Sequence, residues 1–141
     1  AEWPRLAAEL AREFWPGPLT MVVRKGASVP DEVTGGSAGV AVRAPSHPVA
    51  RALIAAVGDA LVAPSANRYQ SISPTRAEHV AASLAGEDVM VLDAGACPSG
   101  IESTVVDVRA EPARWPAVLP CLWLVSPPSA GVCCCHPTCR R

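Results

Sequence analysis

Short hydroxyl and amide side chains crowd one stretch of this 141-residue chain, from Pro64 to Thr75. Ser65, Asn67 and Ser73 lie within it, after a short apolar run and before a segment with a helical pattern. A loop between a strand and a helix exposes backbone N–H groups and short polar side chains near a helix N-terminus, where anions bind well. The stretch could therefore hold a phosphate or a carboxylate. The same residue types are also ordinary turn formers, so a capped surface turn explains the pattern equally well.

Two further segments carry polar groups beside predicted strands. Ser103 and Thr104 follow a flexible glycine and lie where a loop enters the β-branched run 105–108. Arg43 ends the apolar run 40–42. A guanidinium is suited to holding a carboxylate or a phosphate through two parallel hydrogen bonds. Simpler explanations remain open, because Arg43 could form a surface ion pair and Ser103 could cap a strand entrance.

The elements that position these side chains alternate between strands and amphipathic helices. Strands are predicted at 19–24, 40–43, 61–63, 89–92 and in the run that ends at 108. Helices are predicted from Trp3 to Phe14, after Ser46 as N-cap, and from Thr75, where Thr75 and Glu78 match a capping box. Such alternation indicates an α/β domain with an open mixed sheet.

Composition and charge narrow the class of protein. The length allows one domain with a buried core, and half of the residues are hydrophobic. No apolar run approaches the ~20 residues that span a bilayer, and the first residues do not read as a signal peptide. A formal net charge of −1 gives no electrostatic case for a nucleic-acid surface. We therefore expect a cytoplasmic protein without membrane contact.

Four ordered stretches make the chain resemble the YrdC/TsaC family of threonylcarbamoyl-AMP synthases. They are FWPGPLT at 14–20, VRAP at 42–45, PSAN at 64–67 with SPT at 73–75, and the run 100–108. The resemblance covers roughly residues 1–110, which we interpret as a partial YrdC-like domain. It implies a YrdC-like twisted open mixed sheet with flanking helices, here incomplete, and a concave ligand-binding face.

The resemblance also implies an activity. Family enzymes condense L-threonine, bicarbonate and ATP, with Mg²⁺, into threonylcarbamoyl-AMP and pyrophosphate, and the product passes to the machinery that modifies the adenosine beside the anticodon in tRNA. Such a reaction needs positioning and charge stabilisation more than a protein nucleophile. The sequence has no Ser/His/Asp arrangement and no G-x-S-x-G turn. We therefore expect no covalently acting catalytic residue and no protein ligand to a metal.

Carried over position by position, the resemblance assigns two sets of binding residues. The threonine-binding set is Arg43, Ala63 and Ser103. The ATP-binding set is Ser65, Asn67, Ser73 and Thr104. Arg43 would hold the threonine carboxylate, with the Ala63 backbone and Ser103 completing the pocket. Asn67 would support the nucleotide or order its loop, and for Thr104 a purely structural role stays equally open.

The chain also departs from the family pattern. It begins after the tyrosine-containing strand and the Lys/Arg pair that family members use for substrate and phosphates, so we expect the fragment alone to have negligible synthase activity. Gln70 replaces a glycine that is usual in the PSAN-to-SPT loop. The family continues after the run 100–108 with Arg-Pro-Gly, which residues 113–117 only approximate. We therefore interpret residues 111–141 as an atypical, poorly ordered Pro/Cys-rich tail.

Cysteine and histidine gather in that tail at 133–139. These side chains could bind zinc, but three consecutive cysteines lack the spacing of paired C-x-x-C ligands. Cys97 is the only cysteine before the tail, which suits a reducing compartment. We therefore expect no metal site there.

Two other functions remain open. Family members have been associated with double-stranded RNA, so the chain could be an RNA-binding module, although its near-neutral charge weighs against this function. It could also be a carbamoyl-transfer domain of the hydrogenase-maturation type, although PSAN followed by SPT is closer to the tRNA-modification branch. A salt-dependent gel shift, and a comparison of threonine with carbamoyl phosphate, would separate these functions.

Overall fold

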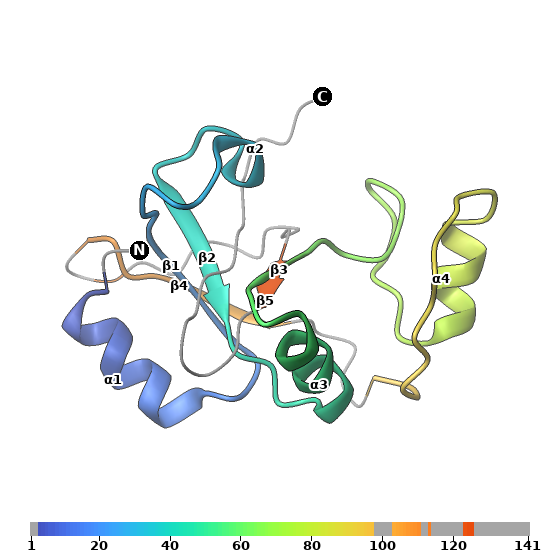
Figure 1. The fold of residues 1–141 in the computed structure, drawn as a ribbon, viewed down its shortest axis with the longest axis horizontal. Coiled ribbons are helices and arrows are strands. Elements are labelled where there is room, and N and C mark those ends of the chain that lie inside the picture. Colours follow the sequence, from blue (N-terminus) through green and yellow to red (C-terminus); the bar gives the residue numbers. More distant parts are fainter. Residues whose placement is uncertain (1–2, 98–102, 111–112, 114–122, 126–141) are drawn as a thin grey trace. The chain divides into compact units, whose positions relative to one another are not determined.

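The computed structural model describes residues 3–97, 103–110, 113 and 123–125 (Figure 1). The chain divides into two compact units. The first consists of Ala1–Pro64 and Ser103–Arg141, and the second is Ser65–Glu102. Within the described part of the chain, every helix is too short or too polar to cross a bilayer.

A five-stranded mixed sheet, in the order β3-β5-β2-β1-β4, forms the centre of the first unit (Figure 1). Its strands are β1 (Leu19–Arg24), β2 (Gly39–Arg43), β3 (Leu61–Ala63), β4 (Thr104–Asp107) and β5 (Trp123–Val125). β1 pairs antiparallel with β2 and parallel with β4, whereas β5 pairs parallel with β2 and antiparallel with β3. The predicted α/β class and open mixed sheet are confirmed.

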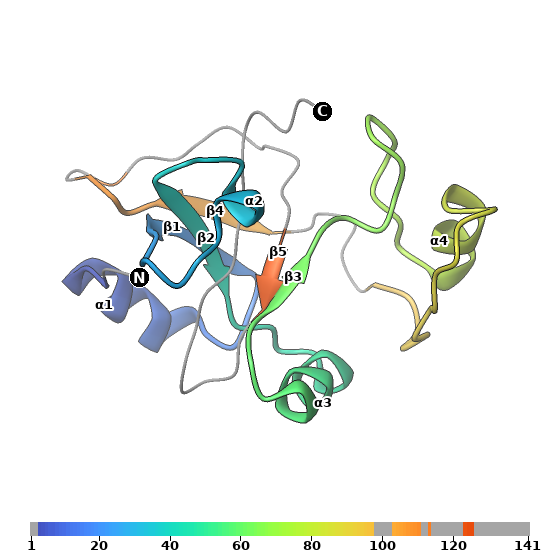
Figure 2. The same cartoon turned by 45° about the horizontal axis from the view of Figure 1, so that its top comes forward.

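The core of this unit lies on one face of the two central strands. Met21, Val23, Val40 and Val42 are completely buried, and they alternate with residues that point to the opposite face. Helix α1 (Arg5–Phe14) lies against β1 and contributes the buried Ala7 to the same core (Figure 2). β-branched residues suit these strands because both have neighbours on either side.

A short helix that the sequence did not predict, α2 (Asp31–Thr34), interrupts the loop between β1 and β2. The ammonium of Lys25 forms an ion pair with Asp31 and a 3.4 Å hydrogen bond with the Thr34 hydroxyl. Gly35 then ends the helix in the left-handed conformation, with φ of 57°. These contacts hold the connection close to the strand ends.

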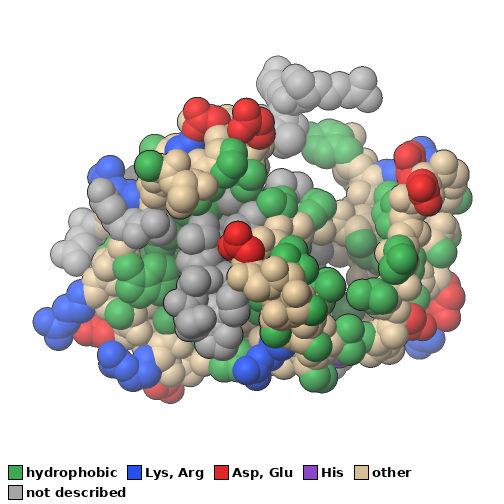
Figure 3. Space-filling view, in the orientation of Figure 1, with side chains coloured by type: hydrophobic (Ala, Val, Ile, Leu, Met, Phe, Trp, Pro, Cys, Tyr) green, Lys and Arg blue, Asp and Glu red, His purple; other side chains and the backbone are tan. Residues whose placement is uncertain are grey.

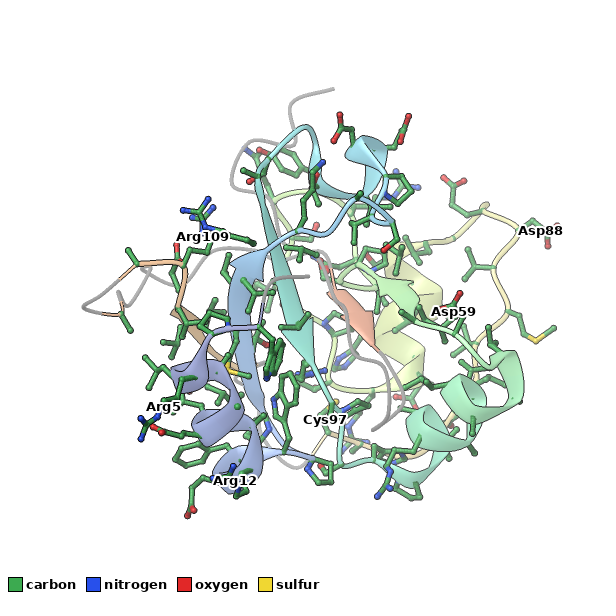
Figure 4. The ribbon with its side chains drawn as sticks, turned by 60° about the vertical axis from the view of Figure 1, so that its left-hand side comes forward. Arg5, Arg12, Asp59, Asp88, Cys97 and Arg109 are labelled. Atoms are coloured by element: carbon green, nitrogen blue, oxygen red, sulfur yellow. The ribbon has the colours of Figure 1, made fainter. Side chains whose placement is uncertain are left out.

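The far end of β4 is fixed by an arginine–aspartate pair. Arg109, labelled in Figure 4, donates from Nη2 to Asp107 Oδ2 at 2.6 Å and from Nε to Asp107 Oδ1 at 3.0 Å. This hydrogen bonding raises the pKa of Arg109, so the guanidinium stays charged at every working pH. The side chain lies so close to Gly39 that a Cβ there would stand 2.4 Å from Arg109 Nη1.

Helix α3 (Pro48–Val57) begins one residue later than the predicted N-cap at Ser46 requires. His47 is the N-cap instead, and its Nδ1 accepts a 3.3 Å hydrogen bond from the Val49 amide. Pro48 fits the first helical position because it has no N–H to satisfy. Gly58 ends the helix as expected, with φ of 75°.

Only Ile54 of α3 is buried. The apolar stripe predicted along the helix remains 42–52% exposed among the described residues, at Val49, Leu53 and Val57. Figure 3 shows hydrophobic side chains gathered on this part of the surface.

The second unit contains one helix, α4 (Ala77–Ser83), and no buried residue among those described. The predicted capping box at Thr75 is wrong, since the helix starts two residues later with Arg76 as N-cap and no side-chain cap. The predicted strand at 89–92 is also wrong. These four residues form no strand and are 40–86% exposed. An isolated apolar run does not become a strand without a partner backbone, and no described strand pairs with this one.

In the tail, Trp123–Val125 forms β5, and Ala113 packs at the edge of the core. The cysteine cluster at 133–139 lies outside the described residues.

Candidate functional site

The strand register places Arg43 and Thr20 on one face of the sheet. Met21 pairs with Val42 in the antiparallel ladder, so the next pair toward the end of β2 is Thr20 with Arg43. Directly opposed residues of an antiparallel pair point to the same face. This is the face opposite to the one that carries Met21 and Val42 into the core. Arg43 is half-buried and Thr20 is completely buried.

Ser103 joins this face from the neighbouring strand. β4 runs parallel to β1 with Leu19 paired to Thr104, which places Ser103 just ahead of β4. The Thr20 hydroxyl donates a hydrogen bond to Ser103 Oγ at 3.4 Å. In strand order, Thr20 on β1 therefore lies between Arg43 on β2 and Ser103 at the start of β4.

Ala63 approaches from the other side of β2, across β5. Arg43 pairs with Val125, and Ala63 pairs with Trp123, two residues earlier on the same strand. Ala63 and Arg43 therefore lie on the same face of the sheet. Two strand spacings and a two-residue offset put the two Cα atoms about 12 Å apart, within reach of an arginine side chain and one amino-acid ligand. The three residues predicted to bind threonine thus belong to one face of one sheet.

The loop predicted to bind ATP is organised by Asn67. Its Nδ2 donates to the carbonyl oxygens of Arg68 at 3.1 Å and Ser71 at 2.9 Å. Ser65 and Ser73, on either side of this closed turn, are half-buried. The structure therefore favours the loop-ordering role among the two roles that the sequence left open for Asn67.

Gln70 has a left-handed backbone, with φ of 65°. Among non-glycine residues such a conformation is uncommon. Glycine adopts this conformation without steric cost, which is consistent with the glycine that the resemblance implied at this position.

The ATP-binding set is divided between the two units. Ser65, Asn67 and Ser73 belong to the second unit, whereas Thr104 belongs to the first, where it is exposed at the start of β4. Thr104 therefore directly follows Ser103 of the threonine-binding set and belongs to a different unit from Asn67.

Sequence reasoning missed two residues at these sites. Thr20 was not among the candidate residues because it lies in an apolar strand, and only its register with Arg43 reveals its position. Arg68 was not considered, yet it makes three hydrogen bonds to the end of α4. A hydroxyl inside an otherwise apolar strand was the available signal for Thr20. No comparable signal was available for Arg68.

The donors at both sites suit anions. They are a guanidinium, hydroxyls, a carboxamide and backbone groups, and the described residues include no cluster of three or more His, Cys, Asp or Glu that could hold a metal ion.

The fold is that of a mixed α/β domain, and one face of its sheet carries Arg43, Thr20 and Ser103. Residues 1–116 match the family model Sua5/YciO/YrdC, described as telomere recombination. The chain therefore belongs to the Sua5/YciO/YrdC family.

Curated relatives carry the name threonylcarbamoyl-AMP synthase. That of Pyrococcus abyssi is 45% identical over 118 residues, covering 84% of this chain and 34% of the relative. That of Schizosaccharomyces pombe is 43% identical over 113 residues, covering 77% of this chain and 28% of the relative. The chain spans about a third of the length of these relatives.

A solved structure agrees with the fold. The crystal structure of P. abyssi Sua5 complexed with L-threonine matches with a TM-score of 0.77 and 44% identity, covering 80% of this chain and 33% of that one. The resemblance first indicated by the four sequence stretches is confirmed.

Proposed function

We propose that this chain forms the L-threonine pocket and part of the ATP-binding surface of a threonylcarbamoyl-AMP synthase. The observation that carries the proposal is the alignment of Arg43, Thr20 and Ser103 across three adjacent strands. The names of the relatives, and the L-threonine bound by the P. abyssi protein, supply the chemistry. The expected substrates are L-threonine, bicarbonate and ATP.

Each group of the pocket has a distinct role toward the amino acid. The guanidinium of Arg43 can donate two parallel hydrogen bonds to the carboxylate, which fixes both its position and its plane. Ser103, oriented by Thr20, donates to or accepts from the remaining polar groups of threonine. The backbone of Ala63 completes the pocket from β3.

The ATP contacts act on the phosphates. Ser65 and Ser73 present hydroxyls from the loop that Asn67 closes. An oxygen of the carbamate, formed from threonine and bicarbonate with loss of water, attacks the α-phosphorus. A P–O bond forms there as the bond to pyrophosphate breaks, and Mg²⁺ that enters with ATP offsets the leaving charge. The protein contributes orientation and charge stabilisation.

The further steps of the proposal follow the family. The product passes to the machinery that modifies tRNA, in the cytoplasm. Residues 1–110 are the family domain and residues 111–141 a tail, of which β5 belongs to the sheet.

L-threonine binding by residues 1–141 tests the proposal directly. In isothermal titration calorimetry we expect the chain to bind L-threonine and to bind L-threoninamide, which lacks the carboxylate, much more weakly. Arg43→Ala should weaken L-threonine binding at least about tenfold, as expected for loss of a charged hydrogen-bond pair. Arg51→Ala, which removes an exposed arginine from α3 of the same unit, should leave the affinity unchanged. Equal affinity for L-threonine and its amide would contradict the carboxylate role of Arg43.

Synthesis is tested in a full-length relative. Replacing the matched segment of the P. abyssi synthase with residues 1–116 should preserve pyrophosphate release that depends on threonine and bicarbonate. Arg43→Ala in this hybrid should reduce that release strongly. A correctly folded hybrid with no threonine-dependent release would overturn the proposed activity.

A further inference from the structure

Arg68 connects the loop between PSAN (64–67) and SPT (73–75) to the end of helix α4 by hydrogen bonds. Its backbone N–H donates to Ser83 Oγ at 3.0 Å, and its Nε donates to the Ser83 carbonyl at 2.8 Å. Its Nη2 also reaches the Ala85 carbonyl at 3.4 Å. One arginine thus contacts the last turn of α4 with both its main chain and its side chain. We call this set of three hydrogen bonds the Arg68 cap.

The Arg68 cap satisfies carbonyl groups that the helix itself leaves open. The last carbonyls of an α-helix have no partner within the helix, and they carry partial negative charge. A cationic side chain that hydrogen-bonds them is favourable for both reasons. Arg68 suits this role better than lysine, because its planar guanidinium donates in fixed directions to two carbonyls at once.

The other end of the same loop is hydrogen-bonded to the beginning of α4. The Thr75 amide donates to His79 Nδ1 at 3.3 Å, and the Thr75 carbonyl accepts from the Cys97 amide at 2.8 Å. The loop therefore spans the helix from its last turn to its first. Its length is fixed between these two attachments.

Between the attachments, the loop turns around the carbonyl of Arg68. This oxygen accepts from Asn67 Nδ2 at 3.1 Å and from the Ser71 amide at 3.0 Å. Any movement of Arg68 must therefore move the turn that lies between Ser65 and Ser73. The second unit has no buried residue among those described, so few packing contacts could hold the loop in place of these hydrogen bonds.

We propose that Arg68 is a positioning residue for ATP: through its cap on α4 it fixes the turn that presents Ser65 and Ser73. It does not touch the nucleotide itself. The inference rests on the proposed function for the role of the two serines, whereas the cap and the turn stand on the hydrogen bonds alone.

The test uses residues 1–141 with three variants. Arg68→Ala removes the side-chain part of the cap, and Arg68→Lys keeps its charge without the forked geometry. Arg76→Ala is the matched control, because it removes an exposed arginine at the opposite end of α4. Exchange of the Ser71 amide, followed by NMR, reports the turn. Calorimetry with ATP and Mg²⁺, and separately with L-threonine, reports the two ligands.

For Arg68→Ala we expect faster Ser71 exchange and ATP affinity that is about threefold weaker, the size expected for loss of a cation at an exposed helix C-terminus. L-threonine affinity should not change, since Arg43, Ala63 and Ser103 belong to the first unit. Arg68→Lys should lie between Arg68→Ala and the unchanged chain. Arg76→Ala should leave Ser71 exchange unaltered.

Unchanged Ser71 exchange in Arg68→Ala would overturn the proposal. An equal loss of ATP affinity in Arg76→Ala would also overturn it, because the effect would then be one of net charge. An unaltered chain that does not bind ATP would contradict the proposed function instead. The Ser71 exchange rates would still decide whether Arg68 positions the turn.

Discussion

A single buried hydroxyl, that of Thr20, lies between Arg43 and Ser103 in the strand order of the proposed threonine pocket. It lies opposite Arg43 in the β1–β2 ladder and donates to Ser103 across the β1–β4 ladder. Burial makes this orientation specific, because a buried hydroxyl without a partner costs free energy. In the proposed pocket, we therefore expect Thr20 to orient Ser103.

Thr20→Val tests that role at constant size. The variant keeps the β-branched shape but leaves Ser103 without its donor, so we expect L-threonine affinity to fall about five-fold, the equivalent of one neutral hydrogen bond. Thr34→Val is the control: Thr34 is equally buried but bonds to Lys25 and the Asp31 carbonyl. It should lower the melting temperature without changing the affinity. Equal losses of affinity in both variants would show that Thr20 has no particular role.

The strands depend on contacts that cross from one to another. Arg109 extends from the end of β4 to the beginning of β2, although β1 lies between them. The ion pair with Asp107 and the absence of a side chain at Gly39 both serve this arrangement. An arginine that packs flat against backbone needs a glycine beneath it.

Gly39→Ala should therefore destabilise the first unit by about 1 kcal/mol, because its Cβ displaces the Arg109 side chain and weakens the pair with Asp107. The cost should be much smaller in an Arg109→Ala background, and a double-mutant cycle in urea measures the coupling. An identical cost in both backgrounds would mean that backbone flexibility at Gly39, rather than Arg109, is responsible.

The sequence predicted some strand bounds correctly and some helix starts wrongly. The bounds of β1 and β3 follow from apolar runs between turn residues, and both were correct. The helix starts failed by one or two residues, because His47 and Arg76 replaced the side-chain caps expected at Ser46 and Thr75. Local pattern does not decide between neighbouring caps of similar free energy.

The pairing of strands that lie far apart in the chain could not be predicted from the sequence. The threonine-binding set could be named from the family likeness, but the register that places Thr20 beside Arg43 depends on strands far apart in the chain. The expected strand at 89–92 failed for the same reason, since an apolar run predicts a strand only when another backbone is available to pair with it. The position of Arg68 on α4 likewise depends on contacts 15 residues away.

Across the whole molecule, burial is concentrated in the first unit. All of the residues that form the hydrophobic core belong to it, whereas the second unit has no buried residue among those described. Regions with few buried apolar contacts open at lower free energy than the core. The unit that carries Ser65 and Ser73 is therefore expected to be the less stable one.

Amide hydrogen exchange tests this difference with a matched pair. The Gly58 amide donates to Ile54 at 2.9 Å in α3, and the Leu84 amide donates to Val80 at 2.9 Å in α4. The two bonds close equivalent helix ends in different units. We expect Leu84 to exchange faster than Gly58, and Val42 in the central strand to exchange most slowly. Equal protection of Gly58 and Leu84 would show that the two units unfold together.

The place of β5 has a consequence for how the molecule is made. β5, the last strand among the described residues, occupies an inner position of the sheet, between β2 and β3. During synthesis on the ribosome, β3 emerges long before the only described strand that pairs with it. Leu61–Ala63 can therefore pair with β5 only after Val125 has left the ribosome. The side of the proposed pocket that includes Ala63 forms only then.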